Sequence, residues 1–346
     1  MDSFAVAEQR SAELTRTIDQ APENFRVLTG ERPTGALHLG HYFGSIVERL
    51  RLQQAGVETF LVLADYQVIT DRDTTARVQE NVHSAVLDYL AAGLDPQRTT
   101  IFTHSAIPAL NQLLLPFLSL VTEAELHRNP TVKAEAAASG RALSGLLLTY
   151  PVHQAADILF CKGNLVPVGK DNLPHVEITR VIARRFNDRY GPVFPVPDAL
   201  LTAAPEVPGL DGRKMSKSYG NTIALSMTAE ETAAVIRRTV TDAERRITFD
   251  PATRPGVSAL LSTAALCRGT TPEQVAEQVG DAGAGRLKQL TTEAVNDFLT
   301  DHRRRRQELA RDPRLVRDIL RRGNARAHEI AEATLTEVRE TMGTTY

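Results

Sequence analysis

Two histidines three residues apart lie in a glycine-rich stretch and could bind an anion. His38 and His41 flank Leu39 and Gly40 within residues 30–44. A strand-like apolar run precedes this stretch and a helical pattern follows it, which is the layout in which backbone N–H groups face an anion. At the entry of a helix both imidazoles can lie on one face and donate hydrogen bonds to phosphate oxygens. The pattern therefore indicates a nucleotide site, and a structural turn with two surface histidines is the alternative.

A second candidate site is a lysine-rich loop in the middle of the chain. Prolines and glycines surround the run Lys214-Met215-Ser216-Lys217-Ser218. Two lysines three residues apart, with hydroxyl groups beside them, form a cationic clamp suited to a triphosphate whose charge shifts during a reaction. On its own such a loop is also typical of solvated surface.

A third candidate is an acidic residue within an apolar helical pattern. Asp157 interrupts the apolar run at residues 155–159, and a buried carboxylate is costly unless it is paired or hydrogen-bonded. Tyr150 and Gln154 lie upstream and add a polar-aromatic cluster that could hold a small ligand. A helix-surface aspartate is the alternative.

The elements that would position these residues alternate between strands and helices. Strands are predicted at 25–28, 59–64, 100–103 and 165–168, and helices at 41–54, 74–92, 108–126, 152–160 and 173–187. This alternation predicts an α/β fold with a Rossmann-type, doubly wound parallel sheet, whose ligands bind beyond the carboxyl ends of the strands. Residues 129–141 are polar and are expected to form a mobile connection.

The C-terminal third is predicted to be helical. Thr228 followed by Glu231 is a capping-box pattern, and later helices are expected at 257–266, 271–279, 286–308 and 313–340, with a break at Gly323 in the last. Arginines between 303 and 322 concentrate positive charge, which indicates either solvated helical surface or contacts with nucleic-acid phosphates.

These patterns predict three parts. Residues 1–24 form a polar extension, expected to be mobile, with too few apolar positions to build a core. Residues 25–222 form the catalytic Rossmann domain, with a connecting insertion around 105–150. Residues 223–346 form a helical domain, and its last helix could pack back onto the first domain.

Composition excludes several classes of protein. The 346 residues are 42% hydrophobic and 24% charged, with a formal net charge of −2, so any nucleic-acid contact needs a local basic patch. Cys161 and Cys267 are far apart, which indicates reduced thiols and neither a disulfide framework nor a metal site. No apolar run reaches the roughly 20 residues of a membrane helix, and no secretory signal is evident. A cytoplasmic protein without a membrane segment is expected.

The two motifs together resemble those of class I aminoacyl-tRNA synthetases. His38-Leu39-Gly40-His41 resembles their HIGH motif with leucine for isoleucine, and the five residues from Lys214 match their KMSKS motif letter for letter. Over roughly residues 26–342 the chain resembles the bacterial tryptophanyl-tRNA synthetases. The stretches that carry this resemblance are 32–35, 148–151, 155–159, 166–169, 240–242, 249–251 and 254–257.

The resemblance implies a reaction and a set of site residues. The enzyme would be a tryptophan–tRNA ligase that uses ATP with Mg²⁺ to form tryptophanyl-adenylate, releases pyrophosphate and charges tRNA(Trp), without a prosthetic group and as a homodimer. The helical domain at residues 223–346 would bind the tRNA and its anticodon. The catalytic residues would be His38, His41, Lys214 and Lys217. The ATP site would contain Arg32, Pro33, Thr34, Gly40, His41, Gly169, Lys170, Asp171, Val207, Lys214, Met215, Ser216, Lys217 and Ser218. The tryptophan site would contain Leu28, Gln67, Tyr150, Gln154, Val166, Val168 and Asn172, with Asp157 accepting the indole N–H.

Several positions depart from the family pattern. Many bacterial members carry phenylalanine, histidine, glutamine, methionine and glutamine where this chain has Leu28, Gln67, Thr131, Gln154 and Asn172, and glutamate is common at the position of Lys170. These departures suggest a divergent, auxiliary form with altered pocket stringency and inhibitor response. A tyrosyl-tRNA synthetase is one alternative, because a carboxylate accepts a phenol O–H as readily as an indole N–H. A regulatory paralogue that does not charge tRNA is the other.

Overall fold

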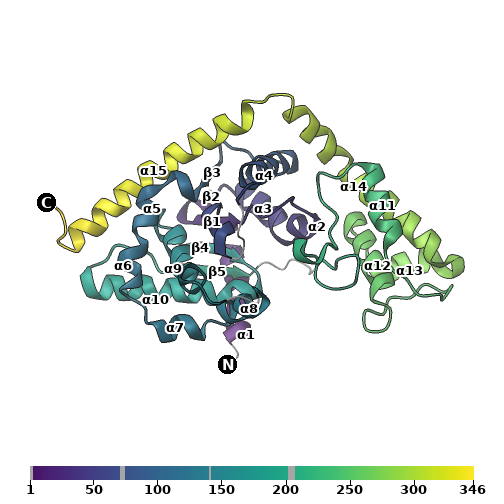
Figure 1. Cartoon of the computed structure of the whole chain (residues 1–346), viewed down its shortest axis with the longest axis horizontal. Coiled ribbons are helices and arrows are strands. Elements are labelled where there is room, and N and C mark those ends of the chain that lie inside the picture. The colour runs from purple at the N-terminus through teal and green to yellow at the C-terminus, as the bar shows by residue number, and fades with distance from the viewer. Residues whose placement is uncertain (1–2, 71–74, 140–141, 202–206) are drawn as a thin grey trace.

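A computed structural model describes residues 3–70, 75–139, 142–201 and 207–346 (Figure 1). Five parallel strands form one sheet in the order β3-β2-β1-β4-β5. Their bounds are β1 Arg26–Glu31, β2 Glu58–Leu63, β3 Thr99–Thr103, β4 Leu165–Val168 and β5 Asp198–Leu201. The strand order reverses between β1 and β4, which confirms the predicted doubly wound sheet and places its switch point at the end of β1. The short edge strand β5 was not among the predicted strands.

The strands alternate their side chains between two hydrophobic clusters. Leu61 and Leu63 of β2 belong to one cluster, and Phe60 and Val62 belong to the other. Because successive residues of a strand point to opposite faces, the two clusters lie on the two sides of the sheet. The helices α3 (Val47–Ala55) and α4 (Val78–Ala92) cover the first side, and α9 (Gly145–Leu159) and α10 (Leu173–Tyr190) cover the second.

The segment between β3 and β4 differs from its prediction. The expected helix at 108–126 is three short helices, α5 (Pro108–Gln112), α6 (Leu114–Leu118) and α7 (Glu123–Arg128). Most of the expected polar connection at 129–141 is the helix α8 (Pro130–Ser139), and residues 140–141 lie outside the described part. Helix α9 begins seven residues before the predicted start at Val152, because its N-cap Ser144 accepts from the N–H of Leu147 and Pro151 is accommodated inside the helix.

The first helix, α1 (Ser3–Gln20), contradicts the expectation of an extension without core contacts. Leu14 and Ile18 are buried against β-strand residues such as Val27 and Leu200. The Oγ of Ser11 also accepts from the backbone N–H of Leu201 at 2.8 Å. Two well-spaced apolar side chains are sufficient because the helix needs to cover only the β5 edge of the sheet.

The C-terminal helices are α11 (Ala229–Arg238), α12 (Pro255–Arg268), α13 (Pro272–Val279), α14 (Gly283–Leu309) and α15 (Leu315–Thr341). The predicted capping box is confirmed, since Thr228 Oγ1 accepts from the N–H of Glu231 at 3.1 Å and Glu231 accepts from the N–H of Thr228 at 2.8 Å. Figure 1 shows α14 leading away from α11, α12 and α13, and α15 returning across the sheet to the far side of the molecule.

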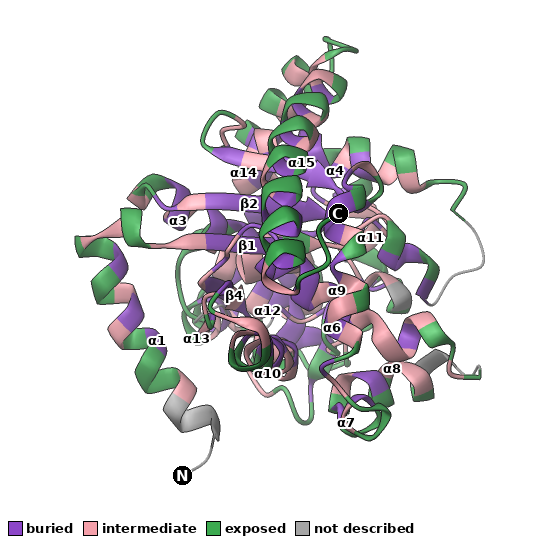
Figure 2. Cartoon of the chain, turned by 90° about the vertical axis from the view of Figure 1, so that its left-hand side faces the viewer, coloured by how far each residue is buried: buried purple, intermediate pink, exposed green. Residues whose placement is uncertain are grey.

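The predicted break at Gly323 is absent from α15, which is continuous. A Cβ atom on Gly323 would lie 1.8 Å from the carbonyl oxygen of Ile101 in β3, so the glycine permits close contact of helix and strand. The next residue, Asn324, accepts from the N–H of Thr103 at 3.0 Å through Oδ1. Figure 2 shows α15 crossing in front of the buried strands. The last helix therefore covers the β3 edge as the first covers the β5 edge.

A buried ion pair joins the C-terminal helices to the domain that contains the sheet. Asp88 of α4 is fully buried, and Arg306 of α14 donates to its Oδ1 at 2.7 Å and to Ser84 at 2.9 Å. His302 lies 3.5 Å from the same carboxylate oxygen. Within the described ranges, no helix is both long enough and apolar enough to cross a membrane.

Candidate active site

The two histidines lie together at the end of β1. His38 has an extended backbone and begins the short helix α2 (Leu39–His41), which is followed by a π-helical turn at Tyr42–Ile46. The ring centroids of His38 and His41 are 3.8 Å apart. Gly40 has no room for a side chain, because a Cβ there would be 2.9 Å from the ring of His38. The glycine of this motif is therefore needed to let the imidazole lie over the turn.

The largely buried carboxylate of Glu31 lies beside two basic side chains of this site. Oε1 of Glu31 lies 3.4 Å from Nε2 of His41 and 3.7 Å from Nζ of Lys217. Burial alone would raise the pKa of Glu31, but the positive charges of His41, Lys217 and Arg49 outweigh it and lower that pKa to about 2. The carboxylate is thus charged at neutral pH and holds the side chains of His41 and Lys217 at the mouth of the turn.

The first histidine behaves differently from the second. Burial, with the nearby positive charges of His41 and Lys217, lowers the pKa of His38 to about 3. His38 is therefore neutral at physiological pH and acts as a hydrogen-bonding group. Among the described residues its Nδ1 has no hydrogen-bond partner, so this nitrogen can serve a ligand.

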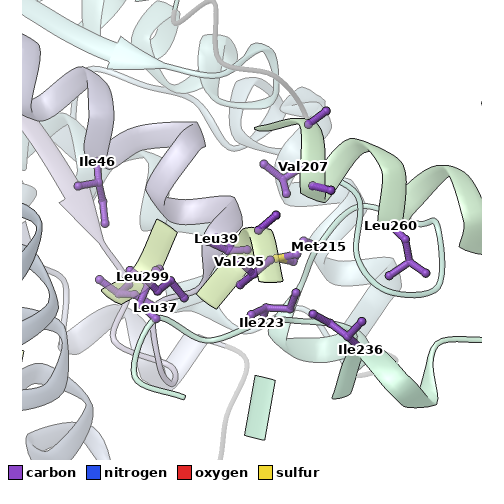
Figure 3. Packing of buried hydrophobic residues seen from close by; sticks show 14 of the residues in the cluster. Leu37, Leu39, Ile46, Val207, Met215, Ile223, Ile236, Leu260, Val295 and Leu299 are labelled. Carbon is purple, nitrogen blue, oxygen red and sulfur yellow. The ribbon is translucent and has the colours of Figure 1, made fainter. Parts of the chain in front are cut away.

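Backbone hydrogen bonds join the two motifs. The N–H of Leu39 donates to the carbonyl of Ile223 at 3.0 Å, and the N–H of Leu225 donates to the carbonyl of Leu37 at 2.9 Å. The segment after the lysine loop therefore runs antiparallel to the histidine turn. Figure 3 shows Leu39, Met215 and Ile223 in the same apolar cluster. The structure thus brings together two motifs that are more than 170 residues apart.

One asparagine organises the lysine loop. The Oδ1 of Asn221 accepts from the N–H of Ser216 at 2.8 Å, and its Nδ2 donates to Asp211 at 2.7 Å and to the carbonyl of Lys214 at 3.1 Å. Gly209 packs so closely that a Cβ there would lie 2.1 Å from Nδ2 of Asn221. The loop therefore has a fixed base, from which the two lysines extend.

The two lysines reach different parts of the site. Lys217 is largely buried, and its stem lies beside Gly35, where a Cβ would be 3.4 Å from Cδ of the lysine. Lys214 is mostly exposed, and its Nζ lies 3.4 Å from Asp171 in the turn after β4. The side chain of Ser218 lies outside the described residues.

The remaining residues predicted for ATP line the same edge of the sheet. Arg32 lies 3.7 Å from Glu135 and donates to Thr70, and the carbonyl of Pro33 accepts from Asn81 at 3.0 Å. Thr34 closes the turn through its N–H, and Gly169, Lys170 and Asp171 form the turn between β4 and α10. Val207 is buried, and its carbonyl accepts from the N–H of Met215.

The predicted ring pocket contains an acidic residue with a histidine beside it. Asp157 of α9 is 4% exposed, and its Oδ1 lies 2.8 Å from Nε2 of His104, which is fully buried. The contact is bent away from the in-line geometry of an ideal hydrogen bond. His104 directly follows β3, so the pair lies at the carboxyl edge of the sheet. Asp157 is therefore not a surface aspartate.

A second buried histidine is fixed on both sides. Nδ1 of His153 lies 2.6 Å from Nε2 of Gln67, and its Nε2 lies 2.8 Å from Oδ1 of Asn111. The amide of Asn111 donates to the carbonyls of His104 and Ile107, both at 2.9 Å, so its oxygen faces the histidine. Burial, the main cause, lowers the pKa of His153. His153 is therefore neutral, carries its proton on Nε2, and accepts from Gln67 at Nδ1.

The other residues of the predicted ring pocket surround this network. Leu28, Val166 and Val168 are buried in the cluster that also contains residues of α9. Gln154 is half-buried on the same helix, and Asn172 is half-buried next to α10. The hydroxyl of Tyr150 lies 3.3 Å from Nε2 of His175, and burial lowers the pKa of His175 to about 4.

The sequence analysis missed four residues that shape the site: Glu31, Arg49, His104 and Asn221. Arg49 is buried and donates to Thr29 at 2.9 Å and to the carbonyl of Gly30 at 2.8 Å. Its position three residues after Ile46, on the apolar face of the predicted helix, was a usable signal. His104 was also detectable, because it directly follows a predicted strand. Glu31 and Asn221 have no comparable signal.

The arrangement combines an anion site with a group of buried apolar side chains around a carboxylate acceptor. Lys214, Lys217 and the histidine turn supply positive charge and hydrogen-bond donors at the end of β1. Asp157 supplies a charged acceptor deep in an apolar environment. Such a site can hold a nucleotide beside a ring that carries an N–H or O–H donor.

Comparisons with known proteins agree with this geometry. The model of the class I tRNA synthetase family for tryptophan and tyrosine (W and Y) matches residues 20–300. A tryptophan–tRNA ligase of Treponema pallidum is 43% identical over 330 residues, which cover 92% of this chain and 96% of that protein. One of Clostridium longisporum is 39% identical over 331 residues, with 92% and 97% covered. The crystal structure of a tryptophanyl-tRNA synthetase from Campylobacter jejuni, complexed with ADP and tryptophan, has a TM-score of 0.81 and 31% identity, and covers 92% of this chain and 99% of that one.

Proposed function

Because the chain belongs to the tryptophan and tyrosine family of class I tRNA synthetases, we propose that the site described above binds ATP at the end of β1 and tryptophan in the pocket beside it. The activity is that of a tryptophan–tRNA ligase, which consumes ATP, tryptophan and tRNA. None of the relatives compared above supports the tyrosyl or the regulatory alternative.

The first step is activation of the amino acid. The carboxylate of tryptophan attacks the α-phosphorus of ATP in line and releases pyrophosphate, so no side chain needs to form a covalent bond. Catalysis then depends on orientation and on stabilising the charge of the leaving pyrophosphate. In the second step the acyl group passes to the terminal ribose of tRNA(Trp).

The charged residues at the end of β1 have separate roles in this proposal. Lys217 lies 3.7 Å from Glu31 and turns toward the triphosphate when ATP binds, and Lys214 approaches from the exposed side. His38 and His41 contact phosphate oxygens from the histidine turn. Mg²⁺ accompanies ATP as part of the substrate complex, and Gly169, Lys170 and Asp171 lie near the ribose.

In the amino-acid pocket, Asp157 accepts the indole N–H. Leu28, Val166 and Val168 contact the ring, with Gln67, Tyr150, Gln154 and Asn172 at its polar margins. The observation that carries the proposal is the pairing of a buried carboxylate in an apolar pocket with a cationic turn at the same edge of the sheet.

We further propose that the enzyme works as a homodimer in the cytoplasm, and that arginines of α14, of α15 and of the turn between them contact tRNA phosphates. Exposed members of this group are Arg304, Arg305, Arg311, Arg314, Arg317, Arg321 and Arg322. Phosphate contacts of this kind position a nucleic acid but do not read its sequence.

Amino-acid-dependent ATP–pyrophosphate exchange tests the proposal, with tryptophan and tyrosine assayed in parallel. Exchange with tryptophan alone is expected. Exchange with tyrosine alone would mean that the ring pocket around Asp157 accepts a phenol. Exchange without charging of tRNA(Trp) would favour a regulatory paralogue.

A further inference from the structure

Asp157, the acceptor in the ring pocket, is paired with the buried His104, a residue so far not assigned to binding. Nε2 of His104 and Oδ1 of Asp157 are 2.8 Å apart in a bent contact, and neither atom has an ideal hydrogen-bond partner among the described residues. A nitrogen lone pair beside an ionised carboxylate oxygen at this distance would be repelled, so the imidazole tautomer that fits an ionised Asp157 carries its proton on Nε2. The contact therefore uses one oxygen of the carboxylate.

The second carboxylate oxygen has no such contact. In the described part of the chain, Oδ2 of Asp157 makes no hydrogen bond, and only Oδ1 is among the fully buried atoms without a partner, so Oδ2 carries what exposure the 6% exposed side chain has. An accessible carboxylate oxygen can accept a hydrogen bond from a ligand N–H. The two oxygens of Asp157 are thus distinguished by the protein.

The ring of His104 is held in place by its surroundings. It lies against the ring of His153 with the two planes tilted by 41° and 4.6 Å between the ring centroids. His153 is fixed by Gln67 and Asn111, and Asn111 also holds the backbone carbonyl of His104. Because His153 already uses both ring nitrogens, this cluster favours a fixed hydrogen-bond pattern over the binding of a cation, although His104, His153 and Asp157 have ligand atoms within 4.8 Å of one another.

We propose that His104 is a positioning residue that determines the preference for an N–H-bearing ring. By holding Oδ1 of Asp157, His104 turns Oδ2 toward the pocket, where it accepts the ring N–H of the substrate. The inference rests on the proposed function, since it assumes that the ring of tryptophan enters this pocket. His104 does not touch the substrate and acts only through Asp157.

The test compares tryptophan with β-(3-benzothienyl)alanine, in which sulfur replaces the ring N–H at almost the same size. Dissociation constants from calorimetry are measured for the natural chain, for His104→Leu and for His104→Gln, whose amide keeps a donor. A hydrogen bond to a charged acceptor corresponds to a preference of about 10- to 100-fold for tryptophan in the natural chain. We expect His104→Leu to remove most of this preference by weakening tryptophan binding alone, and His104→Gln to restore it.

Two outcomes would overturn the inference. A His104→Leu chain that loses affinity equally for both amino acids would show that His104 only supports the pocket wall. A His104→Gln chain that behaves like His104→Leu would show that its donor is irrelevant. If His104→Leu does not fold, His104→Met carries the same prediction, because a flexible side chain fills an irregular site.

A matched control and a separate assay keep this test apart from the proposed function. His302 is also a buried histidine beside a buried aspartate, at 3.5 Å from Asp88 and on α14. His302→Leu should leave the preference between the two amino acids unchanged. Binding of tryptophan without pyrophosphate exchange in the natural chain would contradict the proposed function, while the binding preference would still decide the role of His104.

Discussion

Glu31 is the side chain on which the charges of the nucleotide site converge. It is the last residue of β1, and within 4 Å it meets both His41 and Lys217. In the proposed function ATP competes with Glu31 for the same two side chains. We expect the carboxylate to keep them in place before ATP binds and to release them when it does.

Glu31 should stabilise the fold in a pH-dependent way. Its pKa is about 2 in the folded chain and 4.5 in an ordinary glutamate, so its contribution is present above about pH 4.5 and is lost as the pH falls toward 2. We expect Glu31→Gln to lower the free energy of unfolding by about 3 kcal/mol near neutral pH and by much less near about pH 3. Denaturant unfolding at several pH values measures this. The exposed Glu277→Gln is the control, and a deficit in Glu31→Gln that does not change with pH would contradict the assignment.

Lys217 should act on the rate of activation and not on the binding of tryptophan. Its ammonium group lies at the cationic turn and away from the carboxylate of Asp157, so we expect Lys217→Ala to slow adenylate formation on the order of 10²–10³-fold. The chain contains no tryptophan, so fluorescence of the bound amino acid reports its dissociation constant directly. Lys288→Ala on α14 is the control. A normal activation rate in Lys217→Ala would rule out its proposed role.

Among the helices and strands, the long periodic elements were predictable from sequence and the contacts between them were not. The apolar strands β1 to β4 and the helices α4, α10, α12 and α14 follow hydrophobic spacing, which is a local signal. The helix α9 continues through Pro151, and α15 continues through Gly323, because tertiary packing outweighs a local breaking tendency.

Among the site residues too, the motifs with local spacing were predictable from sequence and the contacts made by the fold were not. The histidine and lysine motifs were recognisable because their residue types are spaced within one turn. His104 and Asp157 are 53 residues apart, so their pairing follows only from the folded topology. Likewise, Asn221 stabilises the lysine loop through three hydrogen bonds that no sequence spacing indicates.

Contact between α15 and β3 should reverse the usual effect of replacing a glycine in a helix. Alanine normally stabilises a helix by up to about 1 kcal/mol relative to glycine. In Gly323→Ala the new methyl group would meet the carbonyl of Ile101, so we expect a lower melting temperature. Gly285→Ala on α14 is the matched control, since a Cβ there meets nothing within 4 Å, and it should be neutral or stabilising. Stabilisation by Gly323→Ala would show that helix and strand do not approach this closely.

Between the sheet domain and the C-terminal helices, the fully buried Asp88 of α4 has Arg306 of α14 as its charge partner. Removing one member of a buried ion pair leaves an uncompensated charge and typically costs about 3–5 kcal/mol. We expect Arg306→Leu to destabilise the chain by that amount in denaturant unfolding, and the double variant Asp88→Leu with Arg306→Leu to be more stable than Arg306→Leu alone. Arg304→Leu, which removes only exposed ion pairs, should have little effect. Equal losses in the single and double variants would argue against a buried pair.

The two ends of the chain close the two edges of the sheet, and this has a consequence for synthesis on the ribosome. Ser11 of α1 is made before its strand β5, so that edge is covered as soon as Leu201 emerges. Asn324 of α15 follows Thr103 of β3 by 221 residues, which takes about 11–44 s at typical translation rates. Throughout that interval the backbone of β3 stays open to other nascent chains. We therefore expect a chain cut short before α15 to be prone to aggregate through the uncovered edge of β3.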